Sequence, residues 1–204
     1  MAATASASPP VEGITHHTAA VNGTTLHYLV RSFAAVEMGL AGFGLEALAD
    51  VTHGGGAWHI GVLAAPGIPE LLFAGGGRER AFLAGAAFPS MTAVAGSITD
   101  LDYDEFARTY SRPGAWRGAA ALYRSMLAEG DEIRALAASS PLAVPVLAVG
   151  AGGGPFTEMT MRQVTAGGEV TARQLDGVSH YAAMEAPERL AEVVLEFVRG
   201  VESA

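Results

Sequence analysis

The side-chain types in this chain narrow the chemistry it can perform. All twelve basic residues are arginine and the chain has no cysteine, so Schiff-base lysines, phosphate-loop lysines and thiolate nucleophiles are excluded. Glu37 follows the apolar run Phe33–Val36, which predicts a carboxylate at the carboxyl end of a strand buried on both faces. Open α/β sheets build their sites at that end. Glu37 is therefore a candidate for acid–base chemistry.

Histidine and glycine patterns elsewhere favour neither a metal nor a cofactor. His16 and His17 are neighbours in an expected strand, so their side chains point to opposite faces and cannot chelate one ion together. The sequence has no H-E-x-x-H motif. The run Gly150–Gly154 follows an expected strand, but Pro155 takes the last position of G-x-G-x-x-G and the acidic residue of a dinucleotide site is missing. We expect no metal and no cofactor.

Length, charge and composition limit the remaining classes. With 204 residues the chain is expected to form one domain. Its net charge of −9 argues against nucleic acid and anionic membranes as partners, and no apolar stretch is long enough to predict a membrane span. Residues 1–12 lack the features of a secretory signal and are expected to be a disordered leader. The absence of cysteine makes the cytoplasm the expected compartment.

The elements that must position these residues follow an α/β order. Asn22-Gly23 joins segments 14–21 and 24–31 into an expected hairpin. The apolar runs at 33–36 and 144–149 predict strands buried on both faces. A helix around 157–164, a strand around 170–175 and a helix from Pro187 complete the order, which predicts the α/β class.

Between these strands, residues 40–140 have a helical pattern. Thr99 and Asp102 form an expected capping box before a helix that places Tyr103 and Tyr110 on one apolar face. Pro113 is expected to open the next helix. Its apolar stripe contains Trp116, Ala119, Ala120, Tyr123 and Leu127.

Several of these stretches together resemble the α/β-hydrolases, in particular the branch of epoxide hydrolases and haloalkane or fluoroacetate dehalogenases. The segments that carry the resemblance are ITHHTAAVNGTTLHYLV, VEMGLAGFG, GGGAWHIGVLAAPGIPELLFAGGGRERAFL, YSRPGAWRGAAALYR and LDGVSHYAAMEAPERLAEVVLEFV. The resemblance implies a shortened α/β-hydrolase-like core over 13–39 and 141–204, with a helical cap inserted at 40–140. No G-x-D-x-G or G-x-S-x-G nucleophile elbow occurs in the sequence, and the connection at Arg31-Ser32 is too short for a parallel crossover. The strand at 24–31 is therefore expected either to pair antiparallel with the strand at 33–36 or to bend into it.

The resemblance places the family's histidine at His180 and, in some dehalogenases, an acid at the position of Glu37. We expect a Glu37–His180 dyad in which the carboxylate fixes the imidazole tautomer and the other nitrogen acts as general base. Asp176, on the same loop as His180, is the competing partner. The alternative is that Glu37 is a solvated strand-end carboxylate and His180 a loop residue without a role.

Further site residues are implied by cap positions of the same family. Tyr123, and with less support Tyr110, match tyrosines whose hydroxyl donates to the epoxide oxygen, although a tyrosine on an apolar helix face is also common in packing. Trp58 and His59 match residues that line the substrate cavity, and Trp116 is added as a further substrate-binding candidate.

Together these residues predict an epoxide hydrolase-like enzyme that works by non-covalent acid–base catalysis on a hydrophobic small molecule. Attack by water would make it a hydrolase, and attack by an internal hydroxyl would make it a cyclase. The alternatives are an inactive ligand-binding protein and a non-functional remnant. Because shortening a sheet exposes its edge strands, a homodimer is also expected as a way to cover them.

Overall fold

Strands in the part of the chain that the structure describes, residues 15–21, 24–49 and 57–203 of a computed structural model, form two separate sheets. β1 (Thr15–Val21) and β2 (Thr24–Val30) pair antiparallel, as the hairpin pattern predicts. β3 (Phe33–Val36), β4 (Val146–Gly150) and β5 (Thr171–Gln174) form a parallel sheet in the order β3-β4-β5. The leader at 1–12 and the Asn22-Gly23 turn lie outside the described residues.

The connection between the two sheets decides between the two expected arrangements of β2 and β3. β2 does not pair with β3, because the chain bends at Arg31 and enters the second sheet, where β3 pairs parallel with β4. Of the two possibilities that the short connection allows, the structure has the bend. The antiparallel pairing of the second and third strands is not formed.

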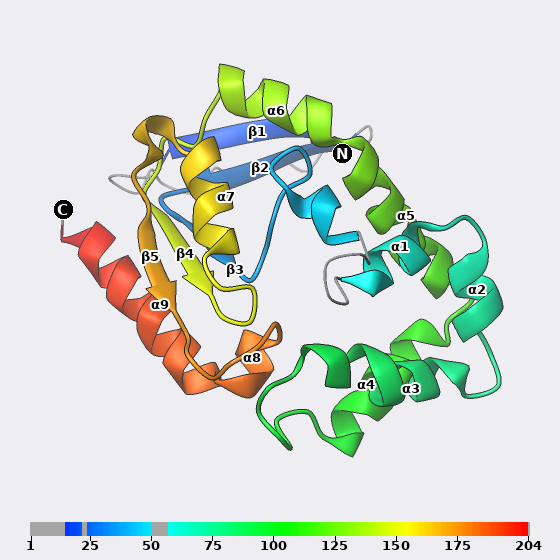
Figure 1. Cartoon of the computed structure of the whole chain (residues 1–204). Helices are drawn as coiled ribbons and strands as arrows, with labels where there is room; N and C mark the ends of the chain where they lie inside the picture. Colours follow the sequence, from blue (N-terminus) through cyan, green and yellow to red (C-terminus); the bar gives the residue numbers. More distant parts are fainter. Residues whose placement is uncertain (1–14, 22–23, 50–56, 204) are drawn as a thin grey trace, which may run out of the picture.

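Helices cover both faces of the parallel sheet (Figure 1). Val146 and Ala148 of β4 point to one face, where α7 (Phe156–Val164) contributes Met161 and Val164. Leu147 and Val149 alternate to the other face, toward α9 (Pro187–Glu202). All of β4 is buried, as its apolar run predicts. The sheet between two helical layers confirms the α/β class.

β3 is more exposed than its apolar sequence predicts. Phe33 is 37% exposed and Ala34 is also exposed, and only Ala35 is fully buried. Among the described strands β3 has β4 as its single neighbour. A strand at a sheet edge can be covered on fewer sides than a central one, which explains why the apolar run alone overestimates its burial.

Between β3 and β4 most of the described residues are helical, as the pattern over 40–140 predicts. The α-helices there are α1 (Trp58–Ala64), α2 (Ile68–Phe73), α3 (Arg78–Phe82), α4 (Asp100–Tyr110), α5 (Ala115–Ala128) and α6 (Gly130–Ser139). Short helical turns lie at Leu45–Ala49, Leu83–Ala87 and Pro89–Met91. In Figure 1 α1 to α5 lie to one side of the parallel sheet, while α6 returns toward β4.

Two apolar clusters hold this helical part together. In one, Leu83, Phe88 and Ile98 are covered by the face of α4 that carries Tyr103 and Tyr110. In the other, Trp116 packs against Leu63 and Phe73. The capping box at Thr99 and Asp102 is present as predicted. Helix α5 begins at Ala115, two residues after Pro113, because Gly114 takes the left-handed conformation at its N-cap.

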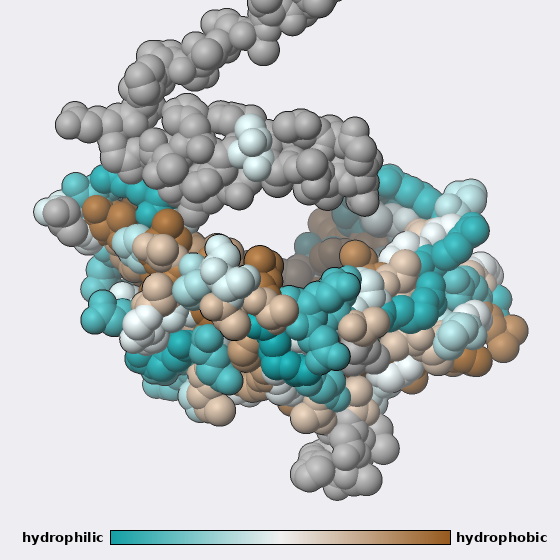
Figure 2. Space-filling view, turned by 90° about the horizontal axis from the view of Figure 1, so that it is seen from above, coloured by the Kyte–Doolittle hydropathy of each residue, from teal (hydrophilic) through white to brown (hydrophobic). Residues whose placement is uncertain are grey.

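Exposed large apolar side chains occur on several helices, and three of them, Ile68, Leu71 and Leu72, lie on α2. The most exposed are Leu71, Leu101, Leu122, Leu136, Met159 and Leu195. On the face seen in Figure 2, hydrophilic and hydrophobic residues are intermixed. The expected homodimer stays a prediction. None of the described helices is both long and apolar enough to cross a membrane.

Candidate functional site

Glu37 lies at the carboxyl end of β3 and points toward the loop that follows β4. Its backbone has a φ of 46°, in the left-handed region that residues other than glycine seldom occupy. The Glu37 N–H donates to the carbonyl of Val149 at 3.0 Å, and the next N–H, of Met38, donates to Thr157 Oγ1 at 3.0 Å. The hydrogen bonds of these two N–H groups therefore hold Glu37 in a backbone conformation that costs free energy. Such strained residues cluster at functional sites.

The Glu37 carboxylate is almost fully buried and is bound by backbone N–H groups. Its side chain is only 6% exposed. Oε1 accepts a hydrogen bond from the N–H of Ala151, and Oε2 accepts the N–H of Gly153 at 3.1 Å. Burial by itself raises the pKa of Glu37, but the contact with His180 and the two N–H donors outweigh burial and lower the pKa below its ordinary value. Glu37 is therefore ionised at neutral pH.

His180 is the imidazole that faces this carboxylate. His180 Nδ1 lies 3.6 Å from Glu37 Oε2, an ion-pair distance slightly longer than a hydrogen bond. Catalytic hydrogen bonds often shorten only when substrate binds. The alternative partner, Asp176, is exposed, and its backbone carbonyl accepts from Arg189. The structure thus brings together the two residues expected to form the dyad, and it leaves the imidazole side chain 47% exposed to water.

The glycine run after β4 contacts both members of this pair: its N–H groups bind Glu37, and its lack of side chains lets the histidine loop approach. A Cβ on Gly152 would lie 2.6 Å from Ser179 Oγ and 2.9 Å from Ser179 Cα, so only glycine lets the histidine loop approach this closely. Sequence reasoning interpreted residues 150–155 only as a loop that had lost its acid, and missed that its N–H groups bind the acid of another strand. The available signal was a glycine run directly after a buried strand, which is a common anion-binding arrangement.

A cavity of about 700 Å³ opens beside the dyad. Glu37, His180, His59 and Tyr123 contribute its titratable groups. The apolar part of its wall includes Met38, Leu48, Trp58, Ile60, Met126 and Phe156. This volume and a mainly apolar wall with few polar groups suit a small hydrophobic ligand.

Two helices bring His59 and Tyr123 to this cavity. His59 lies in α1 and Tyr123 in α5, which pack against each other, and their rings meet edge to face with centroids 6.1 Å apart. Burial lowers the pKa of His59, and the nearby His180 lowers it further. Burial raises the pKa of Tyr123. Both groups are therefore neutral near pH 7 and can donate hydrogen bonds.

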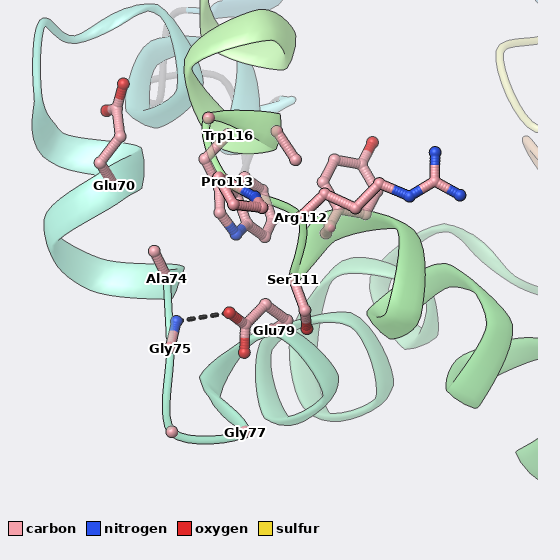
Figure 3. Close-up of a pocket in the computed structure, with 13 residues that line it drawn as sticks. Glu70, Ala74, Gly75, Gly77, Glu79, Ser111, Arg112, Pro113 and Trp116 are labelled. Atoms are coloured by element: carbon pink, nitrogen blue, oxygen red, sulfur yellow. Dashed lines mark hydrogen bonds between the residues drawn. The ribbon is translucent and has the colours of Figure 1, made fainter.

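The structure places two other expected substrate-binding residues elsewhere. Tyr110 and Trp116 stack on each other with centroids 4.6 Å apart, and they line a second cavity of about 290 Å³ together with Glu70 and Glu79. Figure 3 shows this second cavity, in which the Glu79 carboxylate accepts the N–H of Gly75. Since Tyr110 and Trp116 do not line the cavity of the dyad, they are left out of the site. The described residues contain no group of three or more side chains suited to hold a metal ion.

Comparison with known proteins finds similarity at the level of structure. No protein-family model and no curated protein matches the sequence. Wild-type Cfl2 from Burkholderia cenocepacia superimposes with a TM-score of 0.68 and 28% identity, over 82% of this chain and 57% of that one. The Cif epoxide hydrolase from Acinetobacter nosocomialis gives 0.70 and 19%, over 82% and 53%. The epoxide hydrolase CorEH gives 0.61 and 14%, over 92% and 99%.

The three structures differ in how much of their own length this chain matches. The described chain spans a little over half the length of Cfl2 and of the Cif epoxide hydrolase. It spans nearly all of the CorEH chain. At these identities the likeness to the two epoxide hydrolases shows the fold, and the chemistry has to be argued from the site itself.

Proposed function

Because the chain is related to the α/β-hydrolase superfamily and has a shortened form of that fold with a helical cap, we propose that it opens epoxides of hydrophobic small molecules without a covalent intermediate. The observation that carries this proposal is the meeting of the ionised Glu37, the imidazole of His180 and the Tyr123 hydroxyl at one cavity. A general base, its orienting carboxylate and a neutral donor are the groups that such a reaction needs.

The dyad supplies the base. Because the Glu37 carboxylate can only accept, it selects the tautomer of His180 that carries its proton on Nδ1. Nε2 then has a free electron pair and can take a proton from water. The exposure of the His180 side chain gives water access to this nitrogen. A covalent nucleophile is not needed when water can be activated in this way.

Tyr123 and His59 supply the donors for the oxygen that leaves. As the water oxygen forms its bond to an epoxide carbon, the carbon–oxygen bond of the ring breaks and the ring oxygen gains negative charge. The Tyr123 hydroxyl donates to this oxygen, and the neutral His59 can add a second donor. The proton that His180 took from water returns to the alkoxide, so the net change is the addition of water to give a diol. An internal hydroxyl in place of water would give a cyclic ether.

The test measures both turnover and the source of the oxygen. The protein is incubated with aryl and alkyl epoxides in water labelled with ¹⁸O, with enzyme in excess so that only the first turnover is seen. Direct attack by water places ¹⁸O in the diol of that first turnover, whereas a covalent route places an oxygen of the protein there. We expect labelled diol, together with a loss on the order of 10² in rate or more for His180→Gln and Tyr123→Phe.

A matched control separates chemistry from packing. Tyr103→Phe removes a hydroxyl from an aromatic residue that packs in a different cluster, against Phe88, and should leave the rate unchanged. Unlabelled diol from the first turnover would contradict the non-covalent route.

A ligand-binding protein without activity is the second candidate. It is favoured by the absence of a G-x-D-x-G or G-x-S-x-G nucleophile elbow from the sequence. Saturable quenching of Trp58, which lines the cavity, by an epoxide that is never converted to a diol would support this candidate over the enzyme.

A further inference from the structure

Glu185 is a buried carboxylate outside the groups used so far, and it lies next to the histidine loop. It ends α8 (Ala182–Glu185) and is 8% exposed. Oε2 accepts the N–H groups of Ala93 at 2.7 Å and Val94 at 2.9 Å, and Oε1 accepts the N–H of Ser179 at 3.2 Å. One side chain therefore joins three backbone donors from two segments that are far apart in sequence.

The same two segments meet a second time at His180 itself. The backbone N–H of His180 donates to the carbonyl of Met91 at 3.1 Å. Met91 lies in the helical part of the chain, and it lines the dyad cavity together with Ser90, Ser179 and His180. Both segments thus contribute to the wall of the cavity. Glu185 does not line the cavity, but it binds backbone N–H groups of both segments.

We infer that Glu185 is a positioning residue, which holds His180 at Glu37 by fixing the histidine loop to segment 91–94. The inference rests on the proposed role of the dyad. The loop needs such a device because the His180 side chain is half exposed and its contact with Glu37 is long. A carboxylate that accepts several backbone N–H groups makes strong, charge-assisted hydrogen bonds, which are suited to fix the backbone of a loop in one position.

The first measurement is amide hydrogen exchange by NMR in Glu185→Gln. The variant has the same shape, but only one of its two terminal atoms accepts a hydrogen bond. If its amide oxygen keeps Ala93 and Val94, its NH₂ group faces the N–H of Ser179. We expect exchange at Ser179 and His180 to become about tenfold faster or more. Glu192→Gln, a change of the same type at an exposed position of α9, should leave these rates unchanged.

The second measurement separates positioning from mere support of the fold. The tautomer of the His180 imidazole is read from its ¹⁵N shifts, at a pH well above the ordinary histidine value of 6.5. If Glu185 positions the imidazole, the excess of the Nδ1–H form falls severalfold in Glu185→Gln, and Glu185→Asp, which keeps the charge on a shorter side chain, retains part of it. Glu185→Asp also serves if Glu185→Gln does not fold.

The outcomes are distinct from those of the activity test. Faster exchange with an unchanged tautomer would make Glu185 a structural residue and overturn the inference, as would unchanged exchange. Both readouts need no substrate, so a protein that shows no turnover can still pass or fail this test.

Discussion

Replacing Glu37 by glutamine tests the dyad most directly, because it removes a charge while keeping the shape. If the amide oxygen takes the Oε1 position, it still accepts from Ala151. The NH₂ group then faces His180 Nδ1, which must become an acceptor. The imidazole proton moves to Nε2, and the nitrogen that should act as base loses its free electron pair. In another carboxylate–imidazole pair the same reversal costs on the order of 10⁴ in kcat.

The change in stability follows from the same contacts. Hydrogen bonds to a charged group contribute about 1.5–3 kcal/mol each and neutral ones about 0.5–1.5 kcal/mol. The bonds from Ala151 and Gly153 reach an almost fully buried carboxylate, so Glu37→Gln should lower the free energy of unfolding by about 1–3 kcal/mol at pH 7. The contact with the half-exposed His180 is screened by solvent and adds little to this sum.

The contribution of Glu37 to the free energy of unfolding depends on pH. The pKa of Glu37 is lower in the folded protein than its ordinary value of 4.5, so the ionised carboxylate stabilises the fold above pH 4.5. This contribution is lost as the pH falls from there through the folded pKa. Urea unfolding should therefore show a wild-type advantage over Glu37→Gln that is constant near neutrality and shrinks below pH 4.5. An imidazole that keeps its proton on Nδ1 in the variant, or an advantage independent of pH, would refute the reasoning.

Four further substitutions test the structure that supports the site. Gly152→Ala should displace the loop at Ser179 and cost about 1–3 kcal/mol, whereas Gly118→Ala, where a Cβ meets open space on helix α5, should raise the melting temperature. Thr99→Ala removes the cap of α4 and should cost about 1 kcal/mol in thermal unfolding. Leu147→Ala empties a fully buried position in β4 and should cost about 2–5 kcal/mol in urea unfolding; a loss below 1 kcal/mol would mean that the core around it is loosely packed.

Local patterns predicted the elements well, because each depends on residues close in sequence. The capping box at Thr99, the buried strand at 146–150 and the apolar face of α9 are set by spacing alone. The proximity of Glu37 and His180 was also predicted, from the end of a strand and from the family resemblance.

Features that depend on distant partners were not predicted. The exposure of Phe33 depends on which strands flank β3, and the apolar sequence of β3 does not specify its neighbours. Trp116 shares the apolar stripe of Tyr123, and Tyr110 lies on the apolar face of the preceding helix. The packing of α2, α3, α4 and α5 nevertheless places both at another cavity. The donors from Ala151 and Gly153 are backbone N–H groups, so no side-chain type in the sequence identifies them as ligands of Glu37.

The pairing of β3 with β4 also sets the order in which the protein can be assembled. Phe33 aligns with Val146, so β3 leaves the ribosome long before its partner is made, by about 5–20 s at ordinary rates of synthesis. The helices between them have mostly local contacts and can form during this interval. Glu37 acquires its N–H donors only after β4 emerges, and His180 arrives later still. The site therefore cannot form until most of the chain has been synthesised, and the edge of β3 in the nascent chain lacks its β4 partner until then.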